Sequence, residues 1–121
     1  MIKATFITEK NKVILDISGH AGADEKGKDL VCASASILMY TFLQDVSDAF
    51  KMNKLKKKPI VDIDFENGGK AHIEAECKKD DYAGLLHTLF IIQKGFLLLE
   101  HNNKEYVSVT RLDAEKSAED K

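Results

Sequence analysis

Apolar side chains occupy every second position in two runs near the start of the chain, Ile2–Phe6 and Val13–Ile17. Alternation of this kind places the apolar side chains on one face of a strand. Only the polar segment Glu9–Lys12 separates the two runs. The pattern therefore predicts a hairpin of two strands with one buried face.

The longest apolar pattern that follows has helical spacing. Its apolar positions recur every three or four residues and are Val31, Ala35, Leu38, Phe42, Val46 and Ala49. The spacing predicts an amphipathic helix of about twenty residues that is buried along one side. Asp29 stands just before the pattern and is the expected N-cap, because its carboxylate can accept hydrogen bonds from the free N–H groups of the first helical turn.

The second half of the chain repeats this order of strands and helix. Strand-like alternation occurs in Val61–Phe65 and Ala71–Cys77, on either side of a turn at Asn67–Gly69. These segments predict a second hairpin with one polar face. A second helical pattern covers Tyr82–Leu99, and Glu105–Leu112 alternates again as a final strand.

Together the elements predict an α+β fold with the order β-β-α-β-β-α-β. A mixed sheet with two helices packed on one face buries both apolar helix stripes at once. The 121 residues suffice for one domain, which we place at residues 1–112. Residues 113–121 alternate charged and small side chains and are expected to form a flexible tail.

Composition and charge exclude several classes of protein. With 20 acidic and 18 basic residues the net charge is −2, so no overall field attracts nucleic acid or an anionic membrane. The N-terminus lacks the features of a secretory signal, and the apolar stretch Leu85–Leu99 is shorter than the ~20 residues of a bilayer span. We therefore expect a cytoplasmic protein with no membrane or nucleic-acid partner. The lysine-rich run Lys51–Lys58 is expected to be solvated.

No metal or cofactor is predicted. The four histidines and two cysteines lack the paired spacing of a structural zinc site, and no glycine motif for phosphate binding is present. In a reducing cytoplasm both cysteines are expected to be free thiols. Cys77 falls on the inward face of its predicted strand, which indicates a packing role.

Cys32 and His20 form a candidate catalytic pair. If Asp29 caps the helix, Cys32 is its third residue, where unpaired N–H groups and the helix dipole stabilise a thiolate. His20 stands just past the second strand, so the intervening loop can fold it back over the helix start. The alternative interpretation is that Cys32 is a small core residue and His20 an ordinary loop histidine.

The loop between these two residues is rich in glycine. Gly19, Gly22 and Gly27 occur within nine positions, and the only apolar residues between His20 and Leu30 are alanines. Glycine leaves the backbone poorly restrained. We therefore expect a substrate loop that is mobile on its own and becomes ordered when a peptide binds.

The segment Gly19–Gly22, followed by Gly27–Ala33 and then Ser36, resembles the signature of the ribosomal-processing cysteine protease (Prp) family. The order of strands and helices fits that family along nearly the whole chain. The sequence departs from the family pattern at Ala23-Asp24, where an aromatic residue and an alanine are common, and at Ser34-Ala35, where Ala-Val is common. These departures concern the fit of the substrate more than the chemistry.

The resemblance implies a function for the chain. Members of the family are small α+β bacterial proteins, typically dimeric, which use a cysteine and a histidine to remove the N-terminal extension of a large-subunit ribosomal protein. The resemblance implies Cys32 as nucleophile, His20 as general base and Asp29 as the aspartate of the motif, either a cap alone or a cap that also orients His20. The expected partner is a ribosomal-protein precursor. The alternative function is a non-enzymatic ribosome-assembly or protein-binding module that docks through the glycine loop.

Apolar residues outside the two main helical stripes favour a symmetric homodimer. They are Met39, Tyr40, Phe90, Ile91, Leu97 and Leu98. One small sheet does not obviously cover them, and exposed apolar helix surface is typical of an interface. The resemblance implies the same oligomeric state.

Overall fold

The structure is a computed structural model that describes residues 1–20 and 25–114, without the side chains of residues 25–29, 66 and 67. Its elements in chain order are β1 (Ile2–Glu9), β2 (Lys12–Ser18), α1 (Glu25–Lys51), β3 (Ile60–Asp64), α2 (Phe65–Gly68), β4 (Lys70–Glu76), the 3-10 turn η1 (Lys79–Asp81), α3 (Tyr82–Asn102) and β5 (Val107–Asp113). The predicted order of five strands and two long helices is confirmed, with two short additional turns.

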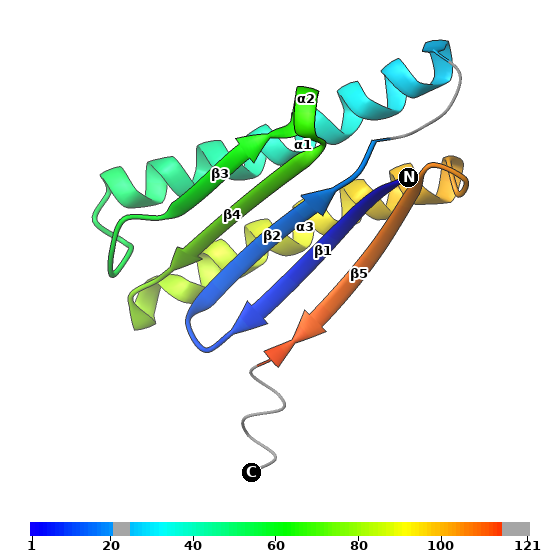
Figure 1. Ribbon diagram of the computed structural model, residues 1–121. Coiled ribbons are helices and arrows are strands. Elements are labelled where there is room, and N and C mark those ends of the chain that lie inside the picture. The colour runs from blue at the N-terminus through cyan, green and yellow to red at the C-terminus, as the bar shows by residue number, and fades with distance from the viewer. Residues whose placement is uncertain (21–24, 115–121) are drawn as a thin grey trace.

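The five strands form one mixed sheet in the order β3-β4-β2-β1-β5 (Figure 1). Neighbouring strands run antiparallel except β1 and β5, which are parallel. The parallel pair arises because α3 carries the chain back across the sheet before β5 begins, as parallel neighbours require. The predicted mixed sheet is therefore confirmed.

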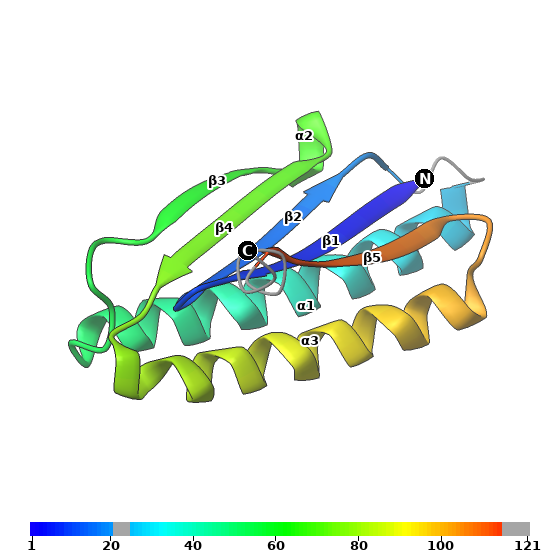
Figure 2. The ribbon, with the colours of Figure 1, turned by 90° about the horizontal axis from the view of Figure 1, so that it is seen from below.

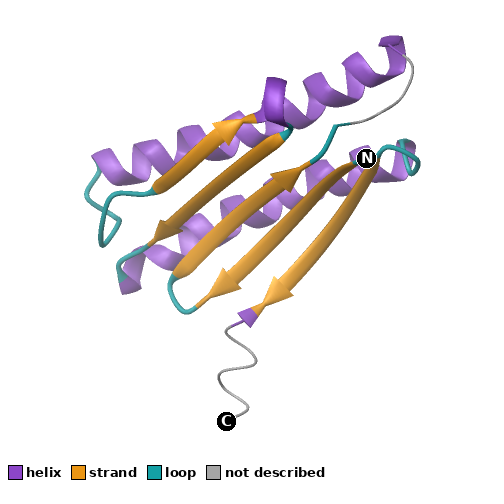
Figure 3. Ribbon diagram, in the orientation of Figure 1, coloured by secondary structure: helices purple, strands orange, loops and turns teal. Residues whose placement is uncertain are grey.

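Both long helices cover the same face of the sheet and run antiparallel to each other (Figures 2 and 3). They approach closely where Gly95 of α3 faces Leu38 of α1. A Cβ atom on Gly95 would lie 2.6 Å from the Leu38 Cδ2 atom. By length and composition alone both helices would also fit a bilayer. In this fold each lays one apolar side on the sheet, as the α+β layer arrangement requires.

The core lies between the sheet and the two helices. The inward residues of β1, namely Ile2, Ala4 and Phe6, are all 0% exposed, which confirms the predicted alternation. The rings of Phe6 and Phe96 meet edge to face, with centroids 5.6 Å apart and an interplanar angle of 66°. Contact between a strand and a helix in this favoured geometry stabilises the stacking of the two layers.

Side-chain contacts fasten the edge strand β5 to its neighbours. The buried hydroxyl of Thr8 donates a hydrogen bond to Asp113 Oδ1 over 2.7 Å. Arg111 contacts the same carboxylate oxygen at 3.2 Å, and its guanidinium lies 4.2 Å from the centre of the Phe90 ring. At the other end of β5 the backbone N–H of Val109 donates to a side-chain oxygen of Glu100 over 2.9 Å. Both ends of the strand are thus held to neighbouring elements.

The first long helix begins earlier than its apolar pattern indicates. α1 starts at Glu25, so Asp29 lies four residues inside the helix and the expectation that it is the N-cap is wrong. The added turn contains Glu25, Lys26 and Lys28. These residue types have good helix propensity, which lets a helix continue where no apolar stripe marks it.

The second hairpin also differs from its prediction. The sequence predicts a strand through Phe65 and a turn at Asn67–Gly69, whereas Phe65–Gly68 form the single helical turn α2. Gly69 ends this turn in the left-handed conformation, and its N–H donates to the carbonyl of Phe65 over 3.1 Å. The turn keeps the Phe65 side chain buried although the strand has ended.

The exposed apolar residues match the predicted set only in part. Tyr40, Ile91, Leu97 and Leu98 are exposed as expected, whereas Met39 is 0% exposed and belongs to the core. Met39 follows Ala35 by four residues and so lies on the same buried side of α1. The other residue of the predicted set, Phe90, is partly covered by Arg111 in the contact given above.

The last strand ends close to its predicted limit. β5 ends at Asp113, one residue past Leu112. Residues 115–121 lie outside the described part of the chain, so the flexible tail stays a prediction.

Candidate active site

His20 stands directly beyond the end of β2. Gly19 links it to the strand with φ +90°, a conformation that side-chain-bearing residues rarely adopt, and a Cβ there would meet the carbonyl oxygen of Met1. The Gly19 N–H donates to the carbonyl of Gly69 over 2.7 Å. His20 itself is exposed, and its ring lies against the Cα of Gly69. The predicted role of Gly19 in a substrate loop stays untested, but its need for glycine is structural.

Cys32 is the eighth residue of α1 rather than the third. Its side chain is partly buried and packs against the core, and it is a free thiol. Only the first four N–H groups of a helix lack an intrahelical partner. The backbone N–H groups nearest Cys32 are therefore committed to the helix, and the expectation that Cys32 sits among unpaired N–H groups is wrong.

β2 ends and α1 begins at the same end of the sheet, which brings the segments that carry His20 and Cys32 to one end of the molecule (Figure 1). The structure gives no hydrogen bond between the two side chains. Catalytic hydrogen bonds are often long without substrate and tighten only in the complex. Gly22 and the side chain of Asp29 lie outside the described residues, so the mobility of the loop and the orienting role of Asp29 stay predictions.

The serine next to the candidate nucleophile is engaged locally. The Ser34 hydroxyl donates to the carbonyl of Leu30 over 2.8 Å, the back-bonding that serines in helices commonly make. The free N–H groups of α1 belong to Glu25–Lys28, at least one turn before Cys32. Among the described residues before α1, the backbone N–H of His20 is another candidate for stabilising an oxyanion, because the Gly19 N–H is bonded to the Gly69 carbonyl.

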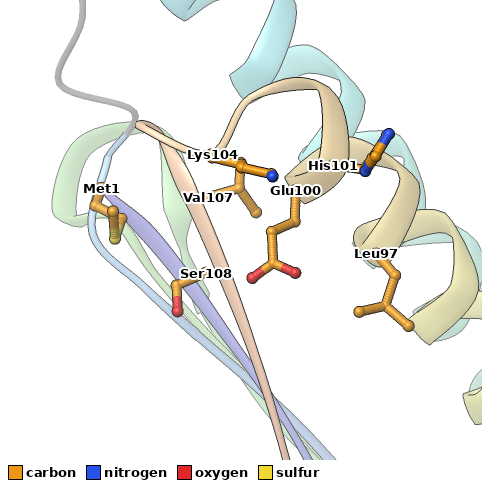
Figure 4. Close-up of a pocket in the computed structure, with 7 residues that line it drawn as sticks. All are labelled: Met1, Leu97, Glu100, His101, Lys104, Val107 and Ser108. Atoms are coloured by element: carbon orange, nitrogen blue, oxygen red, sulfur yellow. The ribbon is translucent and has the colours of Figure 1, made fainter.

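A hollow of about 420 Å³ opens beside the His20 segment, between the end of α3 and the starts of β1 and β5 (Figure 4). Its apolar lining comes from Met1, Leu97 and Val107, and its polar lining from Glu100, His101, Lys104 and Ser108. In Figure 4 the Glu100 carboxylate points into the space and the His101 ring points away from it. Such a mixed lining suits a peptide segment better than a metal ion, which would need several convergent ligands.

The opposite end of the molecule holds a smaller cavity of about 190 Å³, between the end of α1 and the start of α3. Cys77 lines it and is 1% exposed, which confirms the predicted packing role. Burial, together with the nearby Asp81 and Glu76 carboxylates, raises the pKa of the Cys77 thiol to about 11. Over the described ranges of the chain, no group of three His, Cys, Asp or Glu side chains is arranged to hold a metal ion.

The helix-free face of the sheet carries a charged network that the sequence did not reveal. His72 contacts Asp16 at 3.0 Å and Glu74 at 3.2 Å, and Lys12 pairs with Glu74 at 3.3 Å. Burial lowers the pKa of His72, but hydrogen bonds to the two carboxylates outweigh burial and raise it above 6.5. The network forms because β2 and β4, which are distant in sequence, are neighbours in the sheet. It could have been predicted only from the order of strands in the sheet.

Part of the lysine-rich run is also paired. Lys56 and Lys57 each lie 3.7 Å from a carboxylate oxygen of Glu76. The remaining lysines of the run, Lys51, Lys54 and Lys58, have no ion pair within the portion of the chain that the structure describes. Exposed pairs of this kind contribute little to stability.

The fold is an open five-stranded sheet covered on one face by two helices, and one end of it carries a cysteine on α1 and a histidine just past β2. A model of the family described as "Cysteine protease Prp" matches residues 1–108. The chain therefore belongs to the Prp family of cysteine proteases, which confirms the resemblance found in its sequence.

Individual relatives agree with this assignment. The ribosomal processing cysteine protease Prp of Staphylococcus aureus (strain Mu50 / ATCC 700699) is 31% identical over 101 residues, which cover 84% of this chain and 83% of the relative. The crystal structure of the S. aureus protease in complex with a substrate peptide shares the fold, with a TM-score of 0.66 at 21% identity, and covers 92% of this chain and 99% of that one. A crystal structure from Streptococcus mutans aligns with a TM-score of 0.62 at 25% identity, over 93% and 95% of the two chains.

Proposed function

We propose that this chain is an endopeptidase that removes the N-terminal extension of a large-subunit ribosomal protein, with Cys32 as nucleophile and His20 as general base. The carrying observation is the family match over residues 1–108, which spans both residues. The S. aureus relative bears the name of a ribosomal processing protease. Cysteine protease activity belongs to the family; the pair of residues and the substrate are the proposal.

In the first half of the reaction the His20 imidazole accepts the proton of the Cys32 thiol. The thiolate then attacks the carbonyl carbon of the scissile peptide bond and forms a tetrahedral oxyanion. When this intermediate collapses, the C–N bond breaks and the His20 imidazolium donates its proton to the leaving amine. The N-terminal fragment of the substrate is left as a thioester on Cys32, and the C-terminal fragment departs.

In the second half, water hydrolyses the thioester. His20 accepts a proton from the attacking water, and the thiolate leaves and is reprotonated. A pair of groups is sufficient, because one base serves both half-reactions. The oxyanion of each step requires backbone donors, and the N–H groups of residues 20–28 are the candidates that lie before Cys32.

The hollow beside Met1 supports the proposal that an extended peptide lies across this end of the molecule. The hollow is lined by Val107 and Ser108 of β5 and by Glu100 and His101 near the end of α3. The carbonyl oxygen of Met1 lies against Gly19, the residue before His20. Apolar and charged groups together can accept successive side chains of a peptide.

A homodimer in the cytoplasm is also part of the proposal. Its support is the outer surface of the helix layer, where Leu30, Ile37 and Leu98 are 73%, 65% and 66% exposed. Exposed aliphatic side chains of this size on a helix layer are typical of an interface between subunits. The cytoplasmic setting rests on the ribosomal substrate.

The test is cleavage of a ribosomal-protein precursor that carries its N-terminal extension. The wild-type protein is expected to produce one new N-terminus, read by mass spectrometry, whereas Cys32→Ala and His20→Ala are expected to produce none at a measurable rate. Cys77→Ala is the matched control, because Cys77 lies in the core at the other end of the molecule. Full activity in the Cys32 or His20 variant would exclude the assigned pair.

A further inference from the structure

The turn that joins β3 to β4 lies against the side chain of His20. Gly69 ends α2 with φ +60° and ψ +43°, in the left-handed region. Glycine adopts this conformation at no steric cost, and asparagine tolerates it better than other residues with side chains. Helix termination alone therefore does not require that position 69 lacks a side chain.

A second requirement comes from the His20 ring. A Cβ atom built on Gly69 would lie 2.7 Å from His20 Nε2, 2.9 Å from His20 Cδ2 and 2.9 Å from the carbonyl oxygen of Gly19, the residue before His20. All three distances are well below ordinary van der Waals contact, which begins near 3.4 Å. One edge of the imidazole therefore rests directly on the Cα of Gly69, in space that any side chain at this position would fill.

Backbone contacts hold the two segments together. The ladder of β2 and β4 ends with the pair Ser18 and Lys70. One residue further, the Gly19 N–H donates to the Gly69 carbonyl over 2.7 Å. His20 is thus carried on a segment that is hydrogen-bonded to the same residue on which its ring rests.

Other contacts of the ring are few. His20 is exposed, and among the residues for which the structure gives contacts, no hydrogen bond to its ring is present. A side chain at position 69 would therefore meet an imidazole that is exposed and that no hydrogen bond holds within this part of the chain.

We propose that Gly69 is a positioning residue for His20, and this inference rests on the proposed function of His20 as general base. A side chain at position 69 pushes the imidazole away from β4 and changes its distance and angle to Cys32. General-base transfer depends on hydrogen-bond reach. Misplacement of a catalytic group by about 1 Å can cost about a hundredfold in rate.

The test compares glycine variants of the same turn. Gly69→Ala introduces backbone strain together with collisions with the His20 ring and the Gly19 carbonyl, whereas Gly69→Asn keeps a tolerated backbone and retains both collisions. Gly68→Ala is the control, because its Cβ would meet the Asp64 side chain, 2.7 Å from Oδ2 and 3.2 Å from Cγ, and not the His20 ring. The melting temperature, kcat and KM for a precursor peptide are measured for each variant.

Both Gly69 variants are expected to lower kcat about ten- to a hundredfold while KM changes less than about threefold, because peptide binding does not require the base. Gly68→Ala is expected to keep the wild-type kcat. Wild-type kcat in Gly69→Asn, or an equal loss of kcat in Gly68→Ala, would overturn the inference. If His20→Ala is fully active, the role of His20 as general base is excluded. If His20→Ala is inactive and Gly69→Asn is fully active, only the positioning role of Gly69 is excluded.

A measurement on the wild-type protein decides the matter if the Gly69 variants do not fold. NMR of the protein with labelled histidine and glycine is expected to show a nuclear Overhauser effect between the Gly69 α protons and the Hδ2 proton of the His20 ring. If this effect is absent although the backbones of Gly19 and Gly69 remain in contact, the proposed contact between the imidazole and Gly69 is contradicted.

Discussion

The two cysteines of the chain have opposite surroundings. Cys32 is partly buried at the surface of α1, whereas Cys77 is 1% exposed and its pKa is raised to about 11, chiefly by burial. A thiol reacts with alkylating agents through its thiolate. The difference should therefore be visible as selective labelling.

We expect iodoacetamide at pH 8 to alkylate Cys32 in the native protein and to leave Cys77 unmodified, because burial and the raised pKa both suppress its thiolate. In denaturant both cysteines should react. Peptide mapping by mass spectrometry after a short pulse measures the two sites separately. Equal native labelling of Cys77 would show that its surroundings are more open than the structure indicates.

His72 links stability to pH. Its pKa is raised above 6.5 because the hydrogen bonds to Asp16 and Glu74 outweigh burial. A raised pKa in the folded state means that the stabilising contribution is complete below the unfolded value and is lost as the pH rises through the folded value. The pairs that His72 makes therefore stabilise the protein in acid and not in mild alkali.

We expect His72→Gln to lower the free energy of unfolding by about 0.2–1 kcal/mol at pH 5.5 and by less at pH 8.5. Urea unfolding of wild type and variant at the two pH values measures the difference. His87→Gln, at an exposed position of α3 outside the network, is the control. A loss that is larger at pH 8.5 would have the wrong sign and would reject the explanation.

Single residues show where sequence reasoning stops. The inward position of Cys77 follows from alternation along one strand and was predicted. The contact of His72 with Asp16 was not, because it depends on β2 lying beside β4, which no local pattern reveals. The contact of the His20 ring with Gly69 was not predicted for the same reason, although the pair Gly68-Gly69 did indicate a turn.

At the scale of elements, the two long helices meet at a glycine. Gly95 of α3 leaves room for Leu38 of α1, whereas a Cβ on Gly84 of the same helix would have nothing within 4 Å. Replacing glycine in a helix favours the helix by about 0.5–1 kcal/mol. Of these two glycines, only Gly95 lies where steric contact between the helices would oppose the gain in helix stability.

We therefore expect Gly84→Leu to hold or raise the melting temperature and Gly95→Leu to lower it. Overpacking at a tight contact typically costs about 1–3 kcal/mol, which exceeds the gain in helix propensity. Thermal unfolding followed by circular dichroism compares the two variants with the wild type. Similar melting temperatures for both would mean that α1 and α3 can separate there at little cost.

Element boundaries were predictable only where apolar periodicity marks them. The inward faces of β1 and β2 and the buried side of α1 were predicted from spacing. The first turn of α1 was not, because Glu25, Lys26 and Lys28 continue the helix without an apolar position. The turn α2 was missed because Phe65 continues the alternation of β3 although the backbone has already become helical.

At the scale of the whole molecule, the layer arrangement followed from the order of elements, because two amphipathic helices and one sheet bury their apolar sides together only in few ways. The pairing of His20 with Cys32 in the candidate site stays a prediction. The sequence pointed to His20 and Cys32, but placed Cys32 in the first helical turn, whereas the helix starts a full turn earlier. Stabilisation of a thiolate by the N-terminus of α1 therefore does not support Cys32 as the nucleophile.

The outer surface of the helix layer leads to a prediction of oligomeric state. We expect light scattering at about micromolar concentration to give twice the 13.5 kDa mass of the chain. Leu98→Glu should shift the protein to monomer, because a charge at a buried subunit contact is costly. Leu112→Glu, on the helix-free face at 51% exposure, is the matched control. A monomeric wild type would exclude the dimer.

The central claim is that Cys32 forms a covalent bond to the substrate with the help of His20. The most direct measurement is intact-mass analysis of the enzyme after a precursor peptide is mixed in and the reaction is quenched in acid within its first turnovers. We predict an adduct with the mass of the N-terminal fragment minus water, mapped to Cys32, removed by hydroxylamine as a thioester is, and absent from Cys32→Ala. Cleavage of the peptide by Cys32→Ala, or an adduct that maps to another residue, would contradict it.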